Sequence, residues 1–155
     1  MTVINVQPLP VNAQECRARG WDEVDIVLVS GDAYVDHPSF GIALIGRLLE
    51  SHGYRVALLP QPRYDSEVDF HRFGRPRLFF GISGGNLDSI VANYSSNGKV
   101  RDFDAYSPGG SPWRSEIREK SNRFRPDRAV LIYANLARRA FPDTPIIIDR
   151  IKSWL

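Results

Sequence analysis

The chain has 155 residues, of which 43% are hydrophobic, and this suffices for one globular domain with a substantial core. Its 20 basic and 18 acidic residues leave a net charge of +2, which gives no reason to expect a nucleic acid or an anionic membrane as partner. The single cysteine, Cys16, excludes a disulfide framework and an iron–sulfur cluster held by several thiolates of this chain. No apolar run predicts a membrane span or a signal peptide, so we expect a cytoplasmic protein.

Residues 1–23 predict an arm followed by a short helix. Pro8 and Pro10 restrict the extended start of the chain. Asn12 is suited to cap a helix over residues 13–19, and Gly20 is suited to end it. We expect this arm to pack against a second unit, the main domain, which occupies residues 24–155.

The stretch Val24 to Val29 is nearly all aliphatic, which is typical of a strand buried on both faces of a parallel sheet. An acidic loop from Gly31 to Ser39 follows, and an amphipathic helix comes after it. Pro38 is predicted to lie in the first turn of this helix, with Asp36 or His37 as its cap. The apolar residues that we expect this helix to bury are Phe40, Leu44, Ile45, Leu48 and Leu49.

The rest of the chain continues the alternation of strands and helices. Strands are predicted over 55–59, 78–82 and 146–148, and helices over 67–73, 87–94 and 126–141. Residues 95–125 form a long polar loop, expected to be functional, disordered or docked on another part of the protein. The order predicts an α/β fold: a Rossmann-like or flavodoxin-like three-layer sandwich, with a mostly parallel sheet of about four strands in the order 2-1-3-4.

In that strand order, ligands bind where the loops after the first and third strands meet. Glycines in these loops permit close backbone approach, and the polar side chains offer hydrogen bonds. An ordinary turn and helix cap is an equally good interpretation of the second loop. The ligand-binding candidates are Gly31, Asp32, Ala33, Tyr34, Asp36, His37, Ser83, Gly84, Gly85 and Asn86.

The acidic loop is better suited to hydroxyl groups or an amine than to phosphate. A carboxylate about 5 Å from a phosphate repels it by roughly 3 kcal/mol, whereas a helix dipole contributes about 0.3–1 kcal/mol. Neither a GxGxxG nor a GxxxxGK[ST] motif follows any predicted strand. The spacing of Asp32, Asp36 and His37 does not indicate a metal site, and no catalytic residue is predicted.

Three motifs are distinctive when taken together: RGWDEVD from Arg19, GDAYVDHPSFG from Gly31 and DAYSPGG from Asp104. With the stretches LFFGISGGNLDSIVANYSSNGKVR and RPDRAVLIYANLARRAFPDTPIII, they resemble the amino-terminal domain of the YgiQ family of radical SAM proteins. The resemblance runs from about Leu9 to Ile148. It implies a Rossmann-like domain similar to the cobalamin-binding domains that precede many radical SAM barrels.

The resemblance also implies that a parent protein binds S-adenosylmethionine and a 4Fe-4S iron–sulfur cluster through a CxxxCxxC motif on its barrel. This chain lacks that motif, and we expect no cofactor in it. The stretch from Asp36 to Gly41 lacks the DxHxxG spacing of cobalt-ligating proteins, which argues against a cobalamin site in this chain.

The chain is thus expected to be an accessory domain of unassigned reaction, inactive alone, whose partner is the missing radical SAM barrel. Its last residues, from Asp149, depart from the family pattern, which predicts a truncated gene product, a split fragment or an isolated domain, incomplete at the carboxyl end. Two alternatives remain open. The chain could be a free-standing small-molecule-binding module, or an interaction domain that pairs with another copy through the open edge of its last strand.

Overall fold

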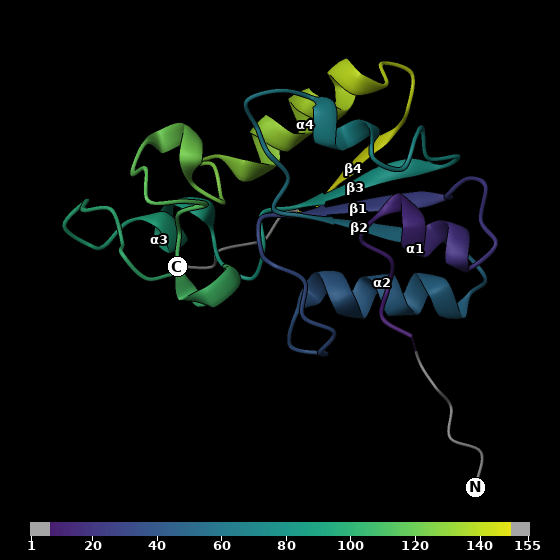
Figure 1. The fold of residues 1–155 in the computed structure, drawn as a ribbon, viewed down its shortest axis with the longest axis horizontal. Coiled ribbons are helices and arrows are strands. Elements are labelled where there is room, and N and C mark those ends of the chain that lie inside the picture. The colour runs from purple at the N-terminus through teal and green to yellow at the C-terminus, as the bar shows by residue number, and fades with distance from the viewer. Residues whose placement is uncertain (1–6, 150–155) are drawn as a thin grey trace, which may run out of the picture.

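The computed structural model describes residues 7–149, and these residues form a four-stranded parallel sheet between two layers of helices (Figure 1). The strands are β1 (Ile26–Ser30), β2 (Val56–Pro60), β3 (Phe79–Ser83) and β4 (Ile146–Ile148). They lie in the order β2-β1-β3-β4, and every neighbouring pair is parallel. The predicted α/β fold, of the Rossmann-like or flavodoxin-like type, and its strand order are confirmed.

The helices are α1 (Ala13–Ala18), α2 (Gly41–Ser51), α3 (Ser89–Asn93) and α4 (Ala129–Ala140), with short 3-10 turns η1 (Val68–His71), η2 (Pro108–Gly110) and η3 (Lys120–Asn122). α2 lies on one face of the sheet, and α4 with η1 lies on the other (Figure 1). The chain moves from β1 to β2 in one direction across the sheet, and then from β2 to β3 and β4 in the other. Right-handed crossovers in opposite directions place their helices on opposite faces, which explains the two layers.

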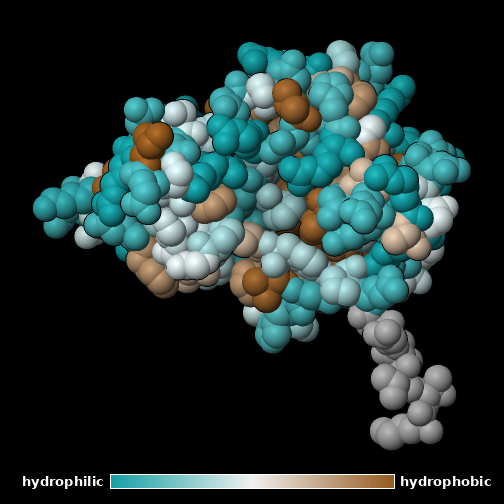
Figure 2. Space-filling model, viewed as in Figure 1, coloured by the Kyte–Doolittle hydropathy of each residue, from teal (hydrophilic) through white to brown (hydrophobic). Residues whose placement is uncertain are grey.

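Each face of β1 packs into a separate apolar cluster because successive side chains point to opposite sides of a strand. Val27 and Val29 pack on the α4 side with Phe80 and Tyr133. Ile26 and Leu28 pack on the α2 side, where the other members are Leu9, Ile42, Val56 and Leu58. Burial on both sides accounts for the continuous aliphatic run in β1. The surface of the molecule, by contrast, is mainly hydrophilic on the side shown in Figure 2.

The amino-terminal arm is part of this packing. The side chain of Asn12 accepts a hydrogen bond from the Glu15 amide at 2.8 Å, which confirms its predicted capping role. The carbonyl of Pro10 accepts from the Leu58 amide at 2.8 Å, so the arm covers the β2 edge of the sheet. Leu9 is 1% exposed within the core on the α2 side.

The predicted start of α2 is wrong. The helix begins at Gly41 with Phe40 at the capping position, so Pro38 lies outside it and neither Asp36 nor His37 caps it. Both side chains are engaged elsewhere: Asp36 pairs with Arg47, and His37 Nδ1 contacts Ser39 Oγ at 2.6 Å.

The predicted buried face of α2 is also largely wrong. The helix packs on the sheet through Ile42, Ala43 and Gly46, and the small residues Ala43 and Gly46 allow the closest approach. A Cβ atom on Gly46 would lie 2.5 Å from Leu9 Cδ1. Of the larger residues expected in the core, Leu49 packs against the cluster on the α2 side, but three are turned outward: Leu44 is 55% exposed, Ile45 40% and Leu48 57%.

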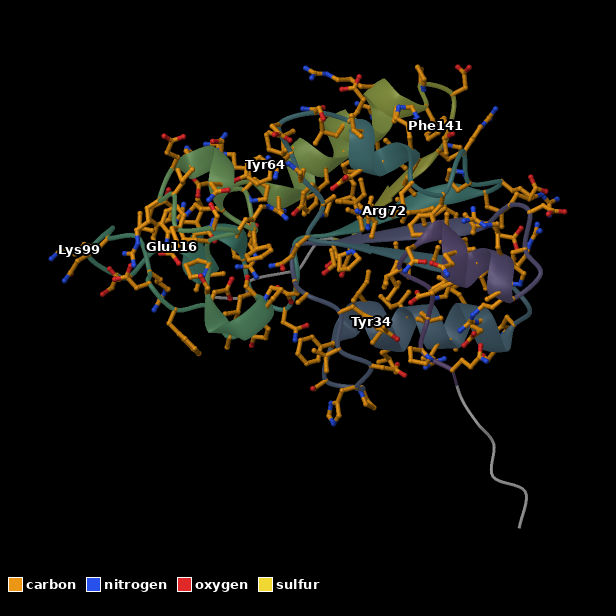
Figure 3. All side chains as sticks on the ribbon, viewed as in Figure 1. Tyr34, Tyr64, Arg72, Lys99, Glu116 and Phe141 are labelled. Carbon is orange, nitrogen blue, oxygen red and sulfur yellow. The ribbon has the colours of Figure 1, made fainter. Side chains whose placement is uncertain are left out.

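The polar loop, residues 95–125, contains two 3-10 turns and has neither an α-helix nor a strand of the sheet. It lies at the carboxyl ends of the strands (Figure 1). The carbonyl of Tyr106 accepts from the Ala33 amide at 2.8 Å, and Arg114 Nη2 donates to the Gln61 carbonyl at 2.7 Å. Tyr64, which is labelled in Figure 3, also donates through its hydroxyl to the Lys120 carbonyl at 2.5 Å. These contacts show that the loop is docked on the rest of the domain, as one of the three expectations stated.

Candidate functional site

The loops after β1 and β3 meet beside the start of α2 and enclose a cavity of about 180 Å³. Four of the predicted candidates line it: Asp32, Ser83, Gly85 and Asn86. The other lining residues are Ser30, Phe40, Gly41, Ile42 and Asp149. This is the position at which the architecture places ligands, but typical ligand sites have roughly 300–1,000 Å³, so the cavity suits a small molecule or part of a larger one.

Asn86 holds the two loops together across the cavity. Its side-chain Oδ1 accepts from the Gly41 amide at 3.4 Å, and its Nδ2 donates to the Ser39 carbonyl at 3.1 Å. Asn86 therefore supplies a contact to the amino terminus of α2 that the apolar residue Phe40 cannot provide. Both serines at the strand ends accept from a nearby amide: Ser30 from Asp32 and Ser83 from Gly85.

Asp32 is engaged through both carboxylate oxygens. Oδ1 accepts from Arg125 Nη2 at 2.8 Å, and Oδ2 accepts from the Asn86 amide at 2.6 Å. Asp32 is 2% exposed and Arg125 is 1% exposed. Burial raises the pKa of Asp32 above its usual value, although the hydrogen bonds from Asn86 and Arg125 act in the opposite direction.

Arg125 also binds a second buried carboxylate. Its Nη1 donates to Asp104 Oδ2 at 2.7 Å, and the Ser107 hydroxyl donates to the same oxygen at 2.6 Å. We call Asp32, Asp104 and Arg125 the ion cluster. It ties the loop after β1 to both the middle and the end of the polar loop. Arg125 Nε is buried and has no hydrogen-bond partner among the described residues.

Gln61 extends this network to the loop after β2. Its Nε2 donates to Ser107 Oγ at 2.7 Å and to the Gly31 carbonyl at 3.1 Å. Gln61 has a φ of 44°, in the left-handed region that side chains other than glycine rarely adopt. The backbone amide of Gln61 donates to the Ser30 carbonyl at 2.8 Å, and this hydrogen bond holds the residue in its conformation.

Two glycines allow the loops to lie against each other. A Cβ atom on Gly31 would overlap the Gly84 carbonyl group, whose carbon would lie at 2.9 Å. Gly85 has a φ of 108°, and a Cβ atom there would overlap the Asp32 carboxylate. The predicted role of these glycines in close backbone approach therefore has a specific basis, which is the packing of one loop on the other.

The remaining candidates lie away from the cavity. The backbone of Ala33 contacts the polar loop, and Tyr34, beside α2 in Figure 3, accepts a hydrogen bond from the Leu9 amide at 3.1 Å. Asp36 is paired with Arg47, and this hydrogen bonding lowers the pKa of Asp36. His37 is exposed. The structure thus brings together the candidates at 31–32 and 83–86 but not those at 33–37.

Sequence reasoning missed Gln61, Asp104, Arg125 and Asp149 as parts of this region. Asp104 opens the distinctive DAYSPGG motif, and Asp149 directly follows a strand, as the loop of Asp32 does. Both positions could have been recognised in the sequence as candidates for this region. Arg125 and Gln61 carry no local signal, because their roles depend on partners far away in the sequence.

The described residues do not fit an iron–sulfur cluster or another metal centre. Within residues 7–149, no three His, Cys, Asp or Glu side chains form a group that could hold a metal ion. Cys16 is buried, and this burial raises the pKa of its thiol, which disfavours the thiolate form that binds metals. No helix in the described part of the chain is both long and apolar enough to cross a membrane.

A family described as Radical SAM N-terminal matches residues 8–155. A UPF0313 protein of Thermotoga petrophila is 48% identical over 147 residues, which are 95% of this chain and 24% of the relative. UPF0313 proteins of Bacteroides thetaiotaomicron and Methanosarcina acetivorans are 47% and 49% identical, again over 95% of this chain but 22% and 18% of their own lengths. The chain therefore spans about a quarter or less of these relatives. No solved structure matches significantly.

Proposed function

Because the chain belongs to the radical SAM N-terminal family, we propose that it is the accessory amino-terminal domain of a longer radical SAM protein. In this proposal, a barrel domain elsewhere in that protein holds the S-adenosylmethionine and the iron–sulfur cluster that the family name implies. The domain described here shapes access to that barrel and has no catalytic activity alone. The length of the relatives supports this proposal, since most of each relative lies outside the matched region.

The ion cluster is the observation that carries the proposal. Its charged groups lie at the carboxyl ends of the strands, where an enzyme of this architecture would place its reactive groups. Here Arg125 is held between Asp32 and Asp104, and these carboxylates also accept from the Asn86 amide and the Ser107 hydroxyl. Breaking such buried pairs is costly, so the cluster serves to fix the loops rather than to exchange protons or bind a substrate. The fixed loops support a domain that contributes a rigid surface rather than catalytic groups.

Reconstitution with iron and sulfide tests the proposal. We would treat this chain and the full-length Thermotoga petrophila relative in parallel, without oxygen, and then add S-adenosylmethionine and a reductant. The visible absorption of a four-iron cluster and the consumption of S-adenosylmethionine are expected in the relative alone. A Cys16→Ser variant of this chain should behave as the unchanged chain does.

Two results would contradict the proposal. A stoichiometric four-iron cluster on this chain would show that it carries the cofactor chemistry itself. A relative that forms no cluster and consumes no S-adenosylmethionine would remove the parent activity that the accessory role assumes.

The cavity favours a second candidate function, a free-standing small-molecule-binding module. Its test is thermal-shift screening with S-adenosylmethionine, cobalamin and nucleotides. Gly41 lines the cavity, and a Cβ atom there has no neighbour within 4 Å. Gly41→Leu therefore adds a Cβ atom that meets open space and a larger side chain at the rim of the cavity. A ligand that stabilises the unchanged chain but not this variant would support the module, and no stabilisation by any of these compounds would contradict it.

A further inference from the structure

An apolar groove of about 360 Å³ runs between α2 and the neighbouring parts of β3 and β4. Phe79, Gly81 and Ile147 form its floor, and Ile45 and Leu49 form one wall. Ile147 is 54% exposed and Ile45 is 40% exposed. Asp149, at the end of the groove, is the one charged residue among its described lining residues. A surface of this composition is unusual on a parallel sheet, because such sheets are normally covered on both faces.

The register of the strands explains which side is bare. Gly81 pairs with Ile147, and both therefore face the α2 side. Their neighbours Phe80 and Ile146 face the other side, where they pack into the cluster that contains α4. Among residues 7–149, α4 thus covers β3 and β4 on one face, and the other face of these two strands is left open.

The exposed apolar surface continues from the groove onto α2. Residues of a helix follow each other at about 100° intervals, so Ile45, Leu48 and Leu44 form one arc that leads outward from the groove wall. All three are at least 40% exposed. The opposite flank of α2 carries Arg47 and Glu50, which form an ion pair at 2.9 Å. The exposed hydrophobic residues are therefore contiguous rather than scattered.

The dimensions of the bare strip match those of a helix. Strands lie about 4.8 Å apart, so β3 and β4 together present a strip about 10 Å wide. An α-helix with its side chains is about 10–12 Å across. In residues 7–149, α2 is the helix that covers this face, and it lies over β1 and β2.

We propose that an apolar helix from the region that follows this domain in the longer relatives lies in the groove and completes the sheet's cover. This inference rests on the proposed function. About three quarters or more of each relative lies outside the matched region. Asp149, at the end of β4, lines the groove, so a segment that continues from β4 starts beside its binding surface. Such tethering gives a high effective concentration, which favours this segment over a second copy of the chain.

Cysteine labelling tests this docking surface. Ile45→Cys would be introduced into this chain and at the aligned position of the full-length Thermotoga petrophila relative. The native proteins would be treated with a thiol reagent, and labelling would be read by peptide mass spectrometry. The introduced thiol should react about tenfold or more slowly in the longer protein, because the docked helix covers it. Leu131→Cys is the matched control: Leu131 is 52% exposed on α4, on the other face of the sheet, and the labelling rate there should change little.

Equal rates at position 45 in both proteins would overturn the inference. So would protection in the isolated chain that increases with protein concentration, since this would identify a second copy as the occupant. Cluster formation by the longer protein is measured separately. A relative with S-adenosylmethionine chemistry but an open groove would therefore contradict the docking surface and leave the accessory role intact.

Discussion

Arg125 compensates two buried carboxylates at once, and its removal should be costly. Arg125→Met keeps much of the side-chain volume but leaves Asp32 and Asp104 buried without their shared cation. Loss of one partner from a buried ion pair costs about 3–5 kcal/mol, so the urea midpoint should fall strongly. Arg118→Met is the matched control, because Arg118 pairs with Asp102 on the surface and such pairs contribute little. Equal midpoints for the two variants would contradict the role assigned to the ion cluster.

Replacement of Gly31 should disturb the packing of the two loops. Gly31→Ala forces a methyl group against the Gly84 carbonyl, which is backbone and cannot rotate away. We expect a loss of about 1–3 kcal/mol in the free energy of unfolding, as is common for overpacking. Gly41→Ala is the control, because its Cβ meets open space at the start of α2 and should raise stability by up to about 1 kcal/mol. Denaturation of both variants measures the difference, and a neutral Gly31→Ala would show that the loops can separate.

At the scale of elements, Asp25 joins the starts of three strands. Its carboxylate accepts from Arg55 Nη2 at 3.0 Å and from Arg77 Nη1 at 3.2 Å. The hydrogen bond from Arg55 lowers the pKa of Asp25, against the opposing effect of burial. Because an unfolded aspartate has a pKa of about 3.9, the folded state binds fewer protons in this range. The resulting stabilisation is complete above about pH 5 and is lost as the pH falls through the folded-state pKa.

Asp25→Asn should therefore destabilise the chain in a pH-dependent manner. The variant keeps the size of the side chain but lacks the charge that Arg55 and Arg77 bind. Its free energy of unfolding should be below that of the unchanged chain at pH 7, and the two values should converge as the pH falls below the folded-state pKa of Asp25. Urea denaturation at a series of pH values measures this. A difference that stays constant from pH 7 to pH 3 would show that the charge of Asp25 is not responsible.

The strands could be predicted from the sequence, whereas the orientation of α2 could not. The run from Ile26 to Val29 indicates a strand, because a strand covered on both faces needs apolar residues at successive positions. For α2, the periodicity offered a wide apolar face, and the large residues were assigned to the core. The helix instead approaches the sheet through Ala43 and Gly46, since small residues allow closer contact. Hydropathy patterns do not contain this preference for close approach.

At the scale of the whole molecule, the meeting of two loops was predictable but the ion cluster was not. Strand order alone brings Asp32 close to the loop at 83–86. Arg125 lies 93 positions from Asp32, at the end of a loop without periodicity, and no local pattern links them. The docking of the polar loop depends on such long-range polar contacts. A single sequence does not reveal their partners.

The exposed arc on α2 should be replaceable by charged residues without loss of the fold. In the isolated chain, Leu44→Lys combined with Leu48→Lys replaces side chains that are 55% and 57% exposed. Leucine and lysine have similar helix propensities, so each change should alter the free energy of unfolding by less than about 0.5 kcal/mol. The fluorescence of a bound hydrophobic dye should fall, because such a dye binds exposed apolar surface. Leu131→Lys on the other side of the sheet should have a smaller effect, because Leu131 does not adjoin the groove. A large loss of stability in the double variant would instead show that the arc is already buried in this chain, and the groove would then have no need of a helix from elsewhere.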